Sequence, residues 1–357
     1  MSSQPHVLVS ARVLDRQVGG NTRYARSVYE RIADFGIRYT LARPPRFSDS
    51  GRFRSVAYAG LEGVVWPISP PAEATVAHFP ADTGAVLRGR LPIVGTIHGL
   101  ATLHLGGVRN SAADRLWRER VRRLAKVSDK IITVSHSSAD DIAFFEPTTA
   151  GRISVIHHGI DHDKFHPRPA GDPASLRRRL GLPERYFLYV GNLDPRKNLL
   201  ALTDASQTVF KETGVPLVVA GAPAWGSRDI MQAVRGTRGV QYLGRVSEAD
   251  LLPLMQGATA FCFPSSYEGF GFPVLEAMAS GTPVICSGRG SLSEVAGDAA
   301  RILNGIDATS IAEAMIELAQ DEKARSELRA RGIVNAERFD WQLSARAHAD
   351  VFRQVSR

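Results

Sequence analysis

The chain has 357 residues, more than one hydrophobic core usually holds, so two domains are expected. Hydrophobic residues make up 44% and charged residues 22%, the proportions of a globular protein rather than of a disordered or fibrous one. No run of residues approaches the length of a bilayer span, and residues 1–15 lack the pattern of a signal peptide.

The formal net charge is +8, and a basic excess occurs in proteins that bind nucleic acid, anionic membranes or phosphorylated substrates. Arginines are spread along the whole chain, and neither zinc-ligand spacing nor an aromatic-rich basic motif for RNA is present. We therefore expect no nucleic-acid partner.

Only two cysteines occur, Cys262 and Cys286, and both lie in apolar, strand-like runs. This setting predicts buried free thiols in a reducing compartment. The expected location is the cytoplasm.

The first half of the chain alternates short strand-like runs with amphipathic helical patterns. Short β-branched runs separated by helices predict parallel strands joined by crossover helices. The predicted strands lie at 6–12, 39–44, 75–80, 92–100, 130–138 and 152–160, with longer helices over 21–36 and 112–127.

Residues 161–179 interrupt this alternation with three prolines and are predicted to form a linker. The alternation then restarts, with strand-like runs at 186–194, 215–223, 240–244, 259–265, 282–287 and 299–304 and a helical carboxy-terminal region. The predicted fold is α/β, with two tandem doubly wound parallel-sheet domains facing a cleft where ligands bind. Residues 1–168, completed by the terminal helix 341–357, would form one domain, and residues 169–340 the other.

The string "YEGFGFPVLEAMASG", residues 267–281, combines two carboxylates with a glycine-bracketed turn. Gly269 and Gly271 allow the backbone to approach a ligand closely, and the predicted helix after them begins with amides that attract anions. Glu276, placed in the first turn of that helix, can accept two hydrogen bonds from a ribose diol, and Glu268 can do the same for another polyol. An acidic first turn alone explains neither the glycine pair nor Glu268, and a dinucleotide fingerprint fails because its third glycine is replaced by Val274.

A second motif, "YVGNLDPRKNL", places Arg196 and Lys197 after a strand that ends near Gly191. The fork of an arginine and the point charge of a lysine suit the two phosphates of a diphosphate, although an isolated pair of this kind is more often merely solvated. Together the two motifs suit a diphosphate between two hydroxylated rings, which is a nucleotide sugar.

At these residues the chain resembles the GT-B-fold retaining glycosyltransferases of family 4. The string "EGFGFPVLE" with "AMASGTPVICS" and "SLSEVAGDAA" is similar to the donor-site signature of that family, and "VGNLDPRKNL" and "VQYLGRVSEADL" match two further motifs in the expected order. Weaker matches are "GGNTRY", "TIHGL", "ITVSHSS" and "VIHHGID". The resemblance covers nearly the whole chain and implies GT-B architecture with two Rossmann-like domains.

The resemblance also implies roles for single residues. Glu268 would bind sugar hydroxyls and Glu276 the ribose, while Arg196 and Lys197 would neutralise the diphosphate. His98 would approach the transferred sugar, although Gly99 stands where the family often has aspartate. The implied donor-binding set is completed by Gly19 and Gly20 over the phosphates, by Gly244, Arg245 and Val246 facing the base, and by Gly191, Gly269, Phe270, Gly271, Phe272, Val274 and Leu275.

His157 and His158 form an adjacent pair that suggests a metal site. Neighbouring residues on a strand point to opposite faces, so the two rings cannot readily share one ion. No other histidines show ligand spacing. We expect no required metal or other cofactor, with the nucleotide sugar as donor substrate.

Seven basic residues lie in the predicted helix 114–130, where Leu116, Val121 and Leu124 are expected to pack inward. The basic face is either solvated or in peripheral contact with an anionic membrane, which would place the protein at the inner face of the membrane.

The predicted reaction moves a hexosyl group, mannosyl or deoxyhexosyl favoured, from a nucleoside-diphosphate sugar to a hydroxyl of a glycan, lipid-linked or small-molecule acceptor. Three alternatives stay open: a nucleotide-sugar epimerase of similar architecture, a pyridoxal-dependent glycan phosphorylase, and a non-enzymatic anion- or nucleic-acid-binding protein. The last leaves the paired glutamates without a purpose.

Overall fold

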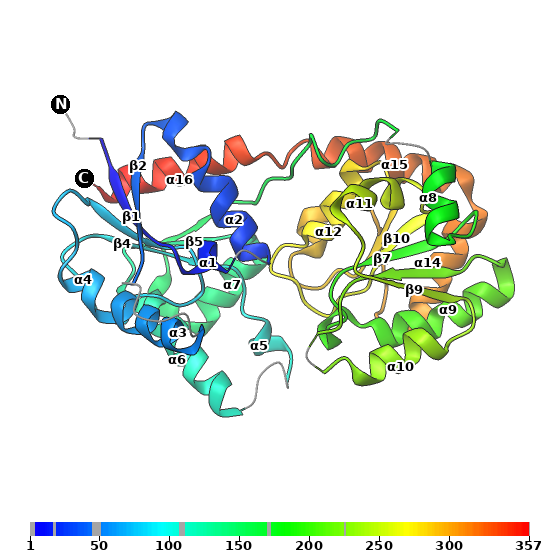
Figure 1. Cartoon of the computed structure of the whole chain (residues 1–357), viewed down its shortest axis with the longest axis horizontal. Coiled ribbons are helices and arrows are strands. Elements are labelled where there is room, and N and C mark those ends of the chain that lie inside the picture. Colours follow the sequence, from blue (N-terminus) through cyan, green and yellow to red (C-terminus); the bar gives the residue numbers. More distant parts are fainter. Residues whose placement is uncertain are drawn as a thin grey trace. The chain divides into compact units, whose positions relative to one another are not determined.

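The structure is a computed structural model that describes residues 4–16, 19–44, 51–106, 111–169, 173–224 and 226–356. The chain divides into two compact units. Unit 1 comprises Met1–Gly159 and Phe339–Arg357, and unit 2 comprises Ile160–Arg338. Each unit contains a six-stranded parallel sheet with helices (Figure 1), which confirms the predicted pair of doubly wound α/β domains.

The sheet of unit 1 has the strand order β2-β1-β3-β4-β5-β6, and all its strands are parallel. The first strand therefore has β2 on one side and β3 on the other, so the order reverses between β1 and β3. This reversal is the switch point at which sheets of this kind bind ligands. The strands are β1 His6–Ser10, β2 Arg38–Ala42, β3 Val76–Phe79, β4 Ile93–Ile97, β5 Lys130–Thr133 and β6 Ile153–Val155.

The helices of unit 1 are mostly short, and one of them contains a π-helical turn. The α-helices are α1 Arg12–Asp15, α2 Gly20–Tyr29, α3 Gly51–Gly60, α4 Trp66–Ile68, α5 Ala101–His104, α6 Ser111–Val127, α7 His136–Phe145 and α16 Trp341–Val355. Two 3-10 helices, η1 Ile32–Phe35 and η3 Pro147–Thr149, and the π-helix η2 Leu61–Val65 complete the unit.

The carboxy-terminal helix α16 packs in unit 1 through a buried network of histidine and tyrosine side chains. In Figure 1 it is drawn in red near the blue α2. The hydroxyl of Tyr24 in α2 lies 2.7 Å from Nε2 of His348 and 3.0 Å from Oγ1 of Thr96 on β4. Thr96 in turn lies 2.8 Å from Nε2 of His78 on β3. Burial lowers the pKa of His348 to about 4, so the ring is neutral at pH 7.

The sheet of unit 2 has the order β12-β11-β10-β7-β8-β9, also parallel throughout. Its first strand, β7, lies between β8 and β10, so the order reverses between β7 and β10. The strands are β7 Phe187–Val190, β8 Leu217–Ala220, β9 Val240–Gly244, β10 Ala260–Phe263, β11 Val284–Cys286 and β12 Arg301–Ile302. Both cysteines are buried on β10 and β11, as predicted.

Unit 2 has the more regular set of helices. They are α8 Pro173–Leu180, α9 Leu199–Thr213, α10 Arg228–Gly236, α11 Glu248–Gln256, α12 Phe272–Ala279, α13 Leu292–Ala296, α14 Ala308–Gln320 and α15 Glu322–Ala336, with the 3-10 turn η4 Pro195–Lys197. Side chains cap several of these helices, as Ser247 does for α11 by accepting a hydrogen bond of 3.2 Å from the Asp250 amide.

The described part of the predicted linker 161–179 packs onto unit 2. Phe165 is buried, and the side chain of Gln256 in α11 donates to the carbonyls of His166 and Arg168 at 2.8 and 2.7 Å. The helix α8 occupies the end of the segment. The division between the units falls between Gly159 and Ile160, nine residues before the predicted boundary, because this polar segment makes its contacts in unit 2.

The basic helix α6 differs from its prediction in two ways. Leu116 is 65% exposed, so the prediction that it packs inward was wrong, whereas Val121 and Leu124 are fully buried. The helix also ends at Val127, before Lys130. Four of its basic side chains form ion pairs: Arg118 with Asp114, Arg122 with Glu119 and Glu146, Arg123 with Glu119, and Lys126 with Glu146. Membrane contact by α6 stays a prediction, and none of the described helices is long and apolar enough to cross a bilayer.

Candidate functional site

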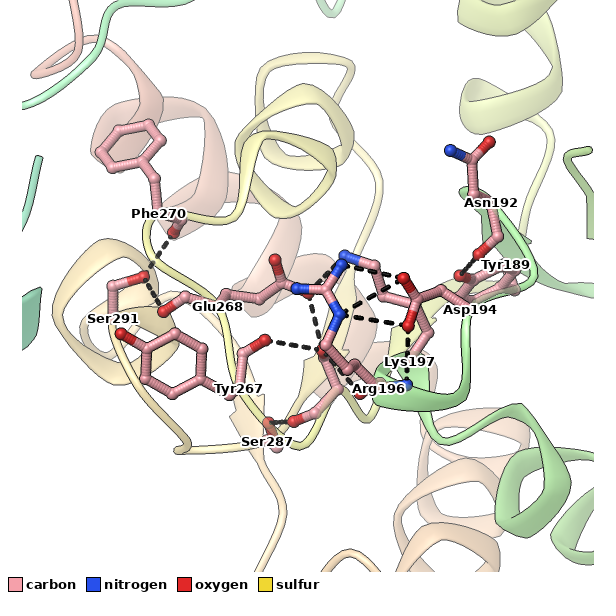
Figure 2. Close-up of polar contacts among 11 residues, drawn as sticks. Tyr189, Asn192, Asp194, Arg196, Lys197, Tyr267, Glu268, Phe270, Ser287 and Ser291 are labelled. Atoms are coloured by element: carbon pink, nitrogen blue, oxygen red, sulfur yellow. Dashed lines mark hydrogen bonds and ion pairs between the residues drawn. The ribbon is translucent and has the colours of Figure 1, made fainter. Parts of the chain in front are cut away.

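The loops that follow β7 and β10 leave the sheet of unit 2 at its switch point. The two strands are hydrogen-bonded neighbours, with Ala260 opposite Phe187. Parallel strands end at the same edge, so the loops after them emerge side by side, and ligands of doubly wound sheets bind there. The sequence-predicted residues Arg196 and Lys197 lie in the first loop and Glu268 in the second, so the fold brings them together (Figure 2).

The loop after β7 turns sharply at η4, and this turn fixes the two basic side chains. Asp194 precedes the turn and accepts a hydrogen bond of 2.9 Å from the Arg196 amide, while Pro195 occupies its first position. Asn198 then adopts a left-handed conformation with φ of 57° and starts α9. The doublet is thus held by local backbone geometry.

Arg196 is paired with Asp194, an acid of the same sequence motif. Its guanidinium donates to both carboxylate oxygens of Asp194, at 3.1 Å from Nε to Oδ1 and 2.9 Å from Nη2 to Oδ2. Burial opposes the ionisation of Asp194, but the hydrogen bonds and charge of Arg196 outweigh it and lower the pKa of the carboxyl. Both groups are therefore charged at pH 7.

Lys197 and Glu268 form a direct ion pair, although they lie 71 positions apart in the chain. Their side chains are only 15% and 13% exposed. The hydroxyl of Ser265 donates to the same carboxylate at 2.6 Å, and the ammonium of Lys197 lies 4.9 Å from the centre of the Phe263 ring. The ammonium thus lies between a carboxylate and an aromatic face, a setting that holds a cation in place.

The glycine-bracketed turn after Glu268 is clamped by residues that follow β11. The hydroxyl of Ser291 donates to the carbonyls of Glu268 at 3.1 Å and Phe270 at 2.8 Å. A Cβ atom on Gly290 would lie 2.4 Å from the Glu268 carbonyl oxygen, so only glycine permits this approach. Ser265, Ser291 and Gly290 support the site but were not predicted from the sequence. Ser291 begins the string that carries the resemblance, which is the one signal that could have identified it.

Gly271 precedes the first residue of α12 with φ of 101°, a conformation that glycine adopts without strain. Glu276 is the fifth residue of this helix, so its predicted place in the first turn was wrong. The helix is also buried on every side from Val274 onward, and Glu276 is 8% exposed. The helix α12 therefore packs inside the unit rather than on its surface.

Two members of the predicted donor-binding set are buried, which limits the contacts that they can make with a ligand. The side chains of Val274 and Leu275 are fully buried. The amide of Val274 donates to the Gly271 carbonyl at 3.0 Å, so this N–H is already engaged. A ligand at the amino end of α12 would therefore meet the amides of the turn before Val274 and the ring of Phe272, which contacts that of Phe270 edge-on at 5.4 Å.

The segment Gly244-Arg245-Val246 begins at the end of β9, two strands from β7. The carbonyl of Gly244 accepts a hydrogen bond of 2.7 Å from the Gly221 amide. This segment and Gly191, whose amide donates to the Ala220 carbonyl at 3.0 Å, lie at the same carboxyl edge as the ion pairs. That Gly244, Arg245 and Val246 face the base of a bound nucleotide stays a prediction.

The predicted residues of unit 1 lie at the corresponding edge of its own sheet. Gly19 precedes α2 with φ of 94°, and Gly20 is the first residue of that helix. His98 directly follows β4; its amide donates to Oδ1 of Asp82 at 2.8 Å, and its ring meets Tyr24 edge-on at 4.8 Å. Burial is the largest cause that lowers the pKa of His98, so its ring is neutral at pH 7.

We predicted that His157 and His158 lie on a strand. Both residues instead follow β6, which ends at Val155. The rings nevertheless turn to different neighbours: His158 is buried near Tyr24 and Trp341, whereas His157 contacts His136 and Phe339. Within the described ranges no group of three or more histidine, cysteine, aspartate or glutamate side chains is arranged to hold a metal ion.

Comparison with protein families decides the relationship of the chain. The profile described as "Glycosyl transferases group 1" matches residues 175–337, and that described as "Glycosyltransferase Family 4" matches residues 74–164. The chain belongs to glycosyltransferase family 4. The first match contains all the predicted residues of unit 2, and the second contains His98.

A curated relative of this family-4 chain is the O-antigen chain mannosyltransferase B of Escherichia coli, which is 37% identical over 217 residues. The alignment covers 59% of this chain and 57% of the relative. The chain spans about three fifths of the length of the curated relatives that it matches.

Solved structures with similar folds include sucrose-phosphate synthase from Thermosynechococcus elongatus, with a TM-score of 0.77 at 20% identity over 98% of each chain. The structure of Anabaena HepE in complex with UDP and glucose gives a TM-score of 0.74 at 17% identity, covering 98% of this chain and 100% of HepE. At such identities the likeness shows the fold, which is the GT-B architecture predicted for a family-4 member.

Proposed function

We propose that this chain is a retaining glycosyltransferase that moves a hexosyl group from a nucleoside-diphosphate sugar to an acceptor hydroxyl. The observation that carries the proposal is the meeting of Lys197, Glu268 and the amino end of α12 at the switch point of unit 2. A diphosphate needs cations and amides, and the sugar beside it needs a carboxylate, and these groups lie together here.

The ion pairs of the site suggest how the donor is received. Asp194 and Glu268 hold Arg196 and Lys197 in place as their negative partners. A diphosphate carries more negative charge than one carboxylate, so it attracts the ammonium of Lys197 more strongly. Glu268 is then free to accept hydrogen bonds from sugar hydroxyls, and Glu276 from the ribose.

The chemical step breaks the bond between the anomeric carbon and the diphosphate oxygen and forms a bond to the acceptor oxygen on the same face. The acceptor proton passes to an oxygen of the departing diphosphate. Negative charge grows on that diphosphate as the bond breaks, and fixed cations and amides stabilise it. The proposal assigns this task to Arg196, Lys197 and the amides before Val274, and includes no metal or other cofactor.

Unit 1 would supply Gly19, Gly20 and His98 to the bound donor. A neutral His98 ring can exchange hydrogen bonds with hydroxyls without adding charge near the anomeric carbon. The acceptor is a hydroxyl of a glycan, a lipid-linked sugar or a small molecule.

A mannosyl or deoxyhexosyl donor is favoured, and the mannosyltransferase of Escherichia coli supports a role in polysaccharide synthesis. HepE was crystallised with UDP and glucose, which keeps UDP-hexoses as competing donors.

A screen of thermal unfolding with GDP-, UDP-, dTDP- and ADP-sugars identifies the donor, because a ligand that binds the folded state raises the midpoint. Nuclear magnetic resonance of the product then gives the anomeric configuration. We expect one nucleotide class to stabilise the protein, and an α-linked donor to give an α-linked product even when EDTA is present. Release of a free sugar isomer without acceptor would indicate an epimerase, and stabilisation by none of the four would remove the proposal.

A further inference from the structure

A second charged cluster, outside the donor site, lies at the switch point of the sheet of unit 1. Ser10 is the last residue of β1, Arg12 follows it, and Thr83 follows the neighbouring strand β3. Glu62 from η2 and Arg120 from α6 complete the group, which we call the Arg12–Glu62 cluster. A switch point is where sheets of this type bind ligands.

Glu62 lies at the centre of the cluster and is only 1% exposed. The Ser10 hydroxyl donates to its Oε1, and Nη1 of Arg12 lies 3.3 Å from its Oε2. Nη2 of Arg12 donates to the carbonyl and hydroxyl of Thr83 at 2.8 and 2.6 Å. Glu62 lies on a π-helical turn, a rare conformation that is frequent at functional sites.

The π-helix is held in place by the loop that carries Thr83. The amide of Val86 donates to the Gly63 carbonyl at 3.1 Å, and a Cβ atom on Gly63 would lie 3.2 Å from a methyl carbon of Val86. Packed backbone therefore holds the π-helix that carries Glu62, and a binding site requires such rigid support.

Three polar atoms of the cluster are buried without a hydrogen-bond partner among the described residues. They are Nε of Arg12, Nη2 of Arg120 and Oε2 of Glu62. Oε2 of Glu62 has its ion pair with Arg12, so the two arginine N–H groups are the atoms that call for a ligand or water, since more than nine in ten buried polar groups find a partner. Two of the three atoms are arginine donors, and the two arginines outnumber the one carboxylate in charge. The surplus of donors and of positive charge fits an anion.

The charged groups of the cluster shift one another's pKa values. Burial is the largest cause that raises the pKa of the Glu62 carboxyl, against the opposing charges of Arg12 and Arg120. Burial also lowers the pKa of the Arg120 guanidinium, and the charge of Arg12 lowers it further. An anion between the two arginines would relieve their mutual repulsion.

The cluster adjoins the residue that is predicted to approach the transferred sugar. Asp82 accepts the amide hydrogen of His98 at 2.8 Å, and the next residue, Thr83, accepts from Arg12. One short loop therefore touches both His98 and the Arg12–Glu62 cluster. An acceptor whose hydroxyl lies near His98 would therefore also lie near the cluster.

We propose that Arg12 and Arg120 bind a phosphate or carboxylate group of the acceptor, so that the acceptor is an acidic or phosphorylated sugar compound. This inference rests on the proposed function, because it names the acceptor class of the same reaction. The anion would accept hydrogen bonds from Nε of Arg12 and Nη2 of Arg120. Glu62, held by Ser10, keeps Arg12 oriented before the acceptor arrives.

Calorimetry with inorganic phosphate tests the site directly on four proteins: the parent, Arg120→Gln, Arg115→Gln and Lys197→Gln. Arg115 is an exposed residue of the same helix α6 and serves as the matched control. We expect Arg120→Gln to weaken phosphate binding by about ten- to a hundredfold, since a charge-assisted hydrogen bond is lost. Arg115→Gln should bind as the parent does, and Lys197→Gln should keep the component that depends on Arg120.

Equal phosphate binding by the parent and Arg120→Gln would overturn the proposal and leave the cluster as a structural support of η2. The variant Glu62→Gln covers the case in which Arg120→Gln fails to fold. It removes the negative charge only, so phosphate should bind several-fold more tightly, and unchanged or weaker binding would equally contradict the site.

Transfer kinetics separate this inference from the donor chemistry. With a phosphorylated sugar and its neutral counterpart as acceptors, Arg120→Gln should raise KM for the phosphorylated acceptor about tenfold or more, and by a clearly larger factor than KM for the neutral one. An effect of equal size on both acceptors would contradict acceptor recognition. If phosphate binding depends on Arg120 but no nucleotide sugar binds the protein, the proposed function fails while the anion site stands.

Discussion

The two units place a charged cluster at the same topological position but build it in different ways. In unit 2 the cluster comes from the two loops that directly follow β7 and β10, and Lys197 and Glu268 meet there. In unit 1 the loops after β1 and β3 supply Arg12 and Thr83, while Glu62 comes from a helix. Both sheets thus direct charge to their switch point, but only unit 2 does so with contiguous motifs.

This difference suggests that the two clusters bind different substrates, the donor and the acceptor. The cluster of unit 2 pairs each cation with one acid and lies beside a helix amino end, which suits a diphosphate common to many donors. The cluster of unit 1 has a surplus of arginine and two buried arginine N–H groups without a hydrogen-bond partner among the described residues, which suits the acidic acceptor proposed above. Changes in the two clusters should therefore have separable effects.

The largest effect is expected from Lys197→Ala. Loss of the ammonium removes a fixed cation from the departing diphosphate, so turnover should fall by about a hundred- to a thousandfold with every acceptor. Release of nucleoside diphosphate measures it. Lys211→Ala, an exposed lysine on the adjoining helix α9, is the matched control and should retain the turnover of the parent. A fall limited to acidic acceptors would contradict the assignment of this lysine to the donor.

As the pH falls, unit 1 should lose folding stability at a higher pH than unit 2. The pKa of His348 is lowered from 6.5 to about 4 when the chain folds, so the unfolded chain binds a proton more readily between these values. The titration of His348 alone should lower the free energy of unfolding of unit 1 by about 3 kcal/mol as the pH drops from 6.5 to 4, and the buried rings of His78 and His158 add to this loss. The neutral ring of His98 acts in the same direction, whereas Glu62, with its raised pKa, acts in the opposite one.

In unit 2 the pKa of Asp194 is lowered below 3.8, so its contribution to stability is present above that pH and is lost only as the pH falls below it. Hydrogen exchange followed by mass spectrometry resolves the two units. Equal loss of amide protection in both between pH 6.5 and 4 would contradict this order.

A smaller effect, confined to unit 2, is expected from Gly271→Ala. The residue has φ of 101°, and its Cβ would lie 2.5 Å from Cδ2 of Leu292. We expect a loss of about 1–3 kcal/mol in the free energy of unfolding, measured by chemical denaturation, and weaker donor binding. Gly236→Ala in α10, where φ is not positive and a Cβ meets nothing within 4 Å, should change stability by less than about 1 kcal/mol. Equal losses in the two variants would show that the turn before α12 is not strained by a side chain.

The smallest expected effect is the reaction of the two cysteines of the folded protein with a thiol reagent. Burial raises the pKa of Cys286 to about 12, and Cys262 is equally buried. Neither should react with a thiol reagent at pH 8 until unit 2 unfolds, so labelling reports on this unit alone. Rapid labelling of the folded chain would show that the core around β10 and β11 opens independently.

Contiguous patterns made the fold and the charged cluster of unit 2 predictable. Strand runs and the loop motifs "NLDPRKN" and "EGFGFP" lie next to each other in the sequence, and the sheet topology alone brings Lys197 to Glu268. What sequence reasoning missed depends on tertiary packing. The burial of α12 on all sides, the exposure of Leu116 and the packing of the segment around Phe165 onto unit 2 follow from neighbours distant in the chain.

The cluster of unit 1 was not predictable for the same reason. Apart from the neighbours Ser10 and Arg12, its members are separated by more than twenty residues each and share no motif. Only the order of strands and the π-helical turn bring them together.

Calorimetric titration of the donor found in the thermal screen into the parent, Lys197→Ala and Glu276→Ala tests the central claim most directly. We predict that the parent binds the nucleotide sugar, that the affinity is at least tenfold lower in both variants, and that Lys211→Ala binds as the parent does. Affinity for the nucleotide sugar that is the same in all four proteins would contradict the placement of the donor at the switch point of unit 2.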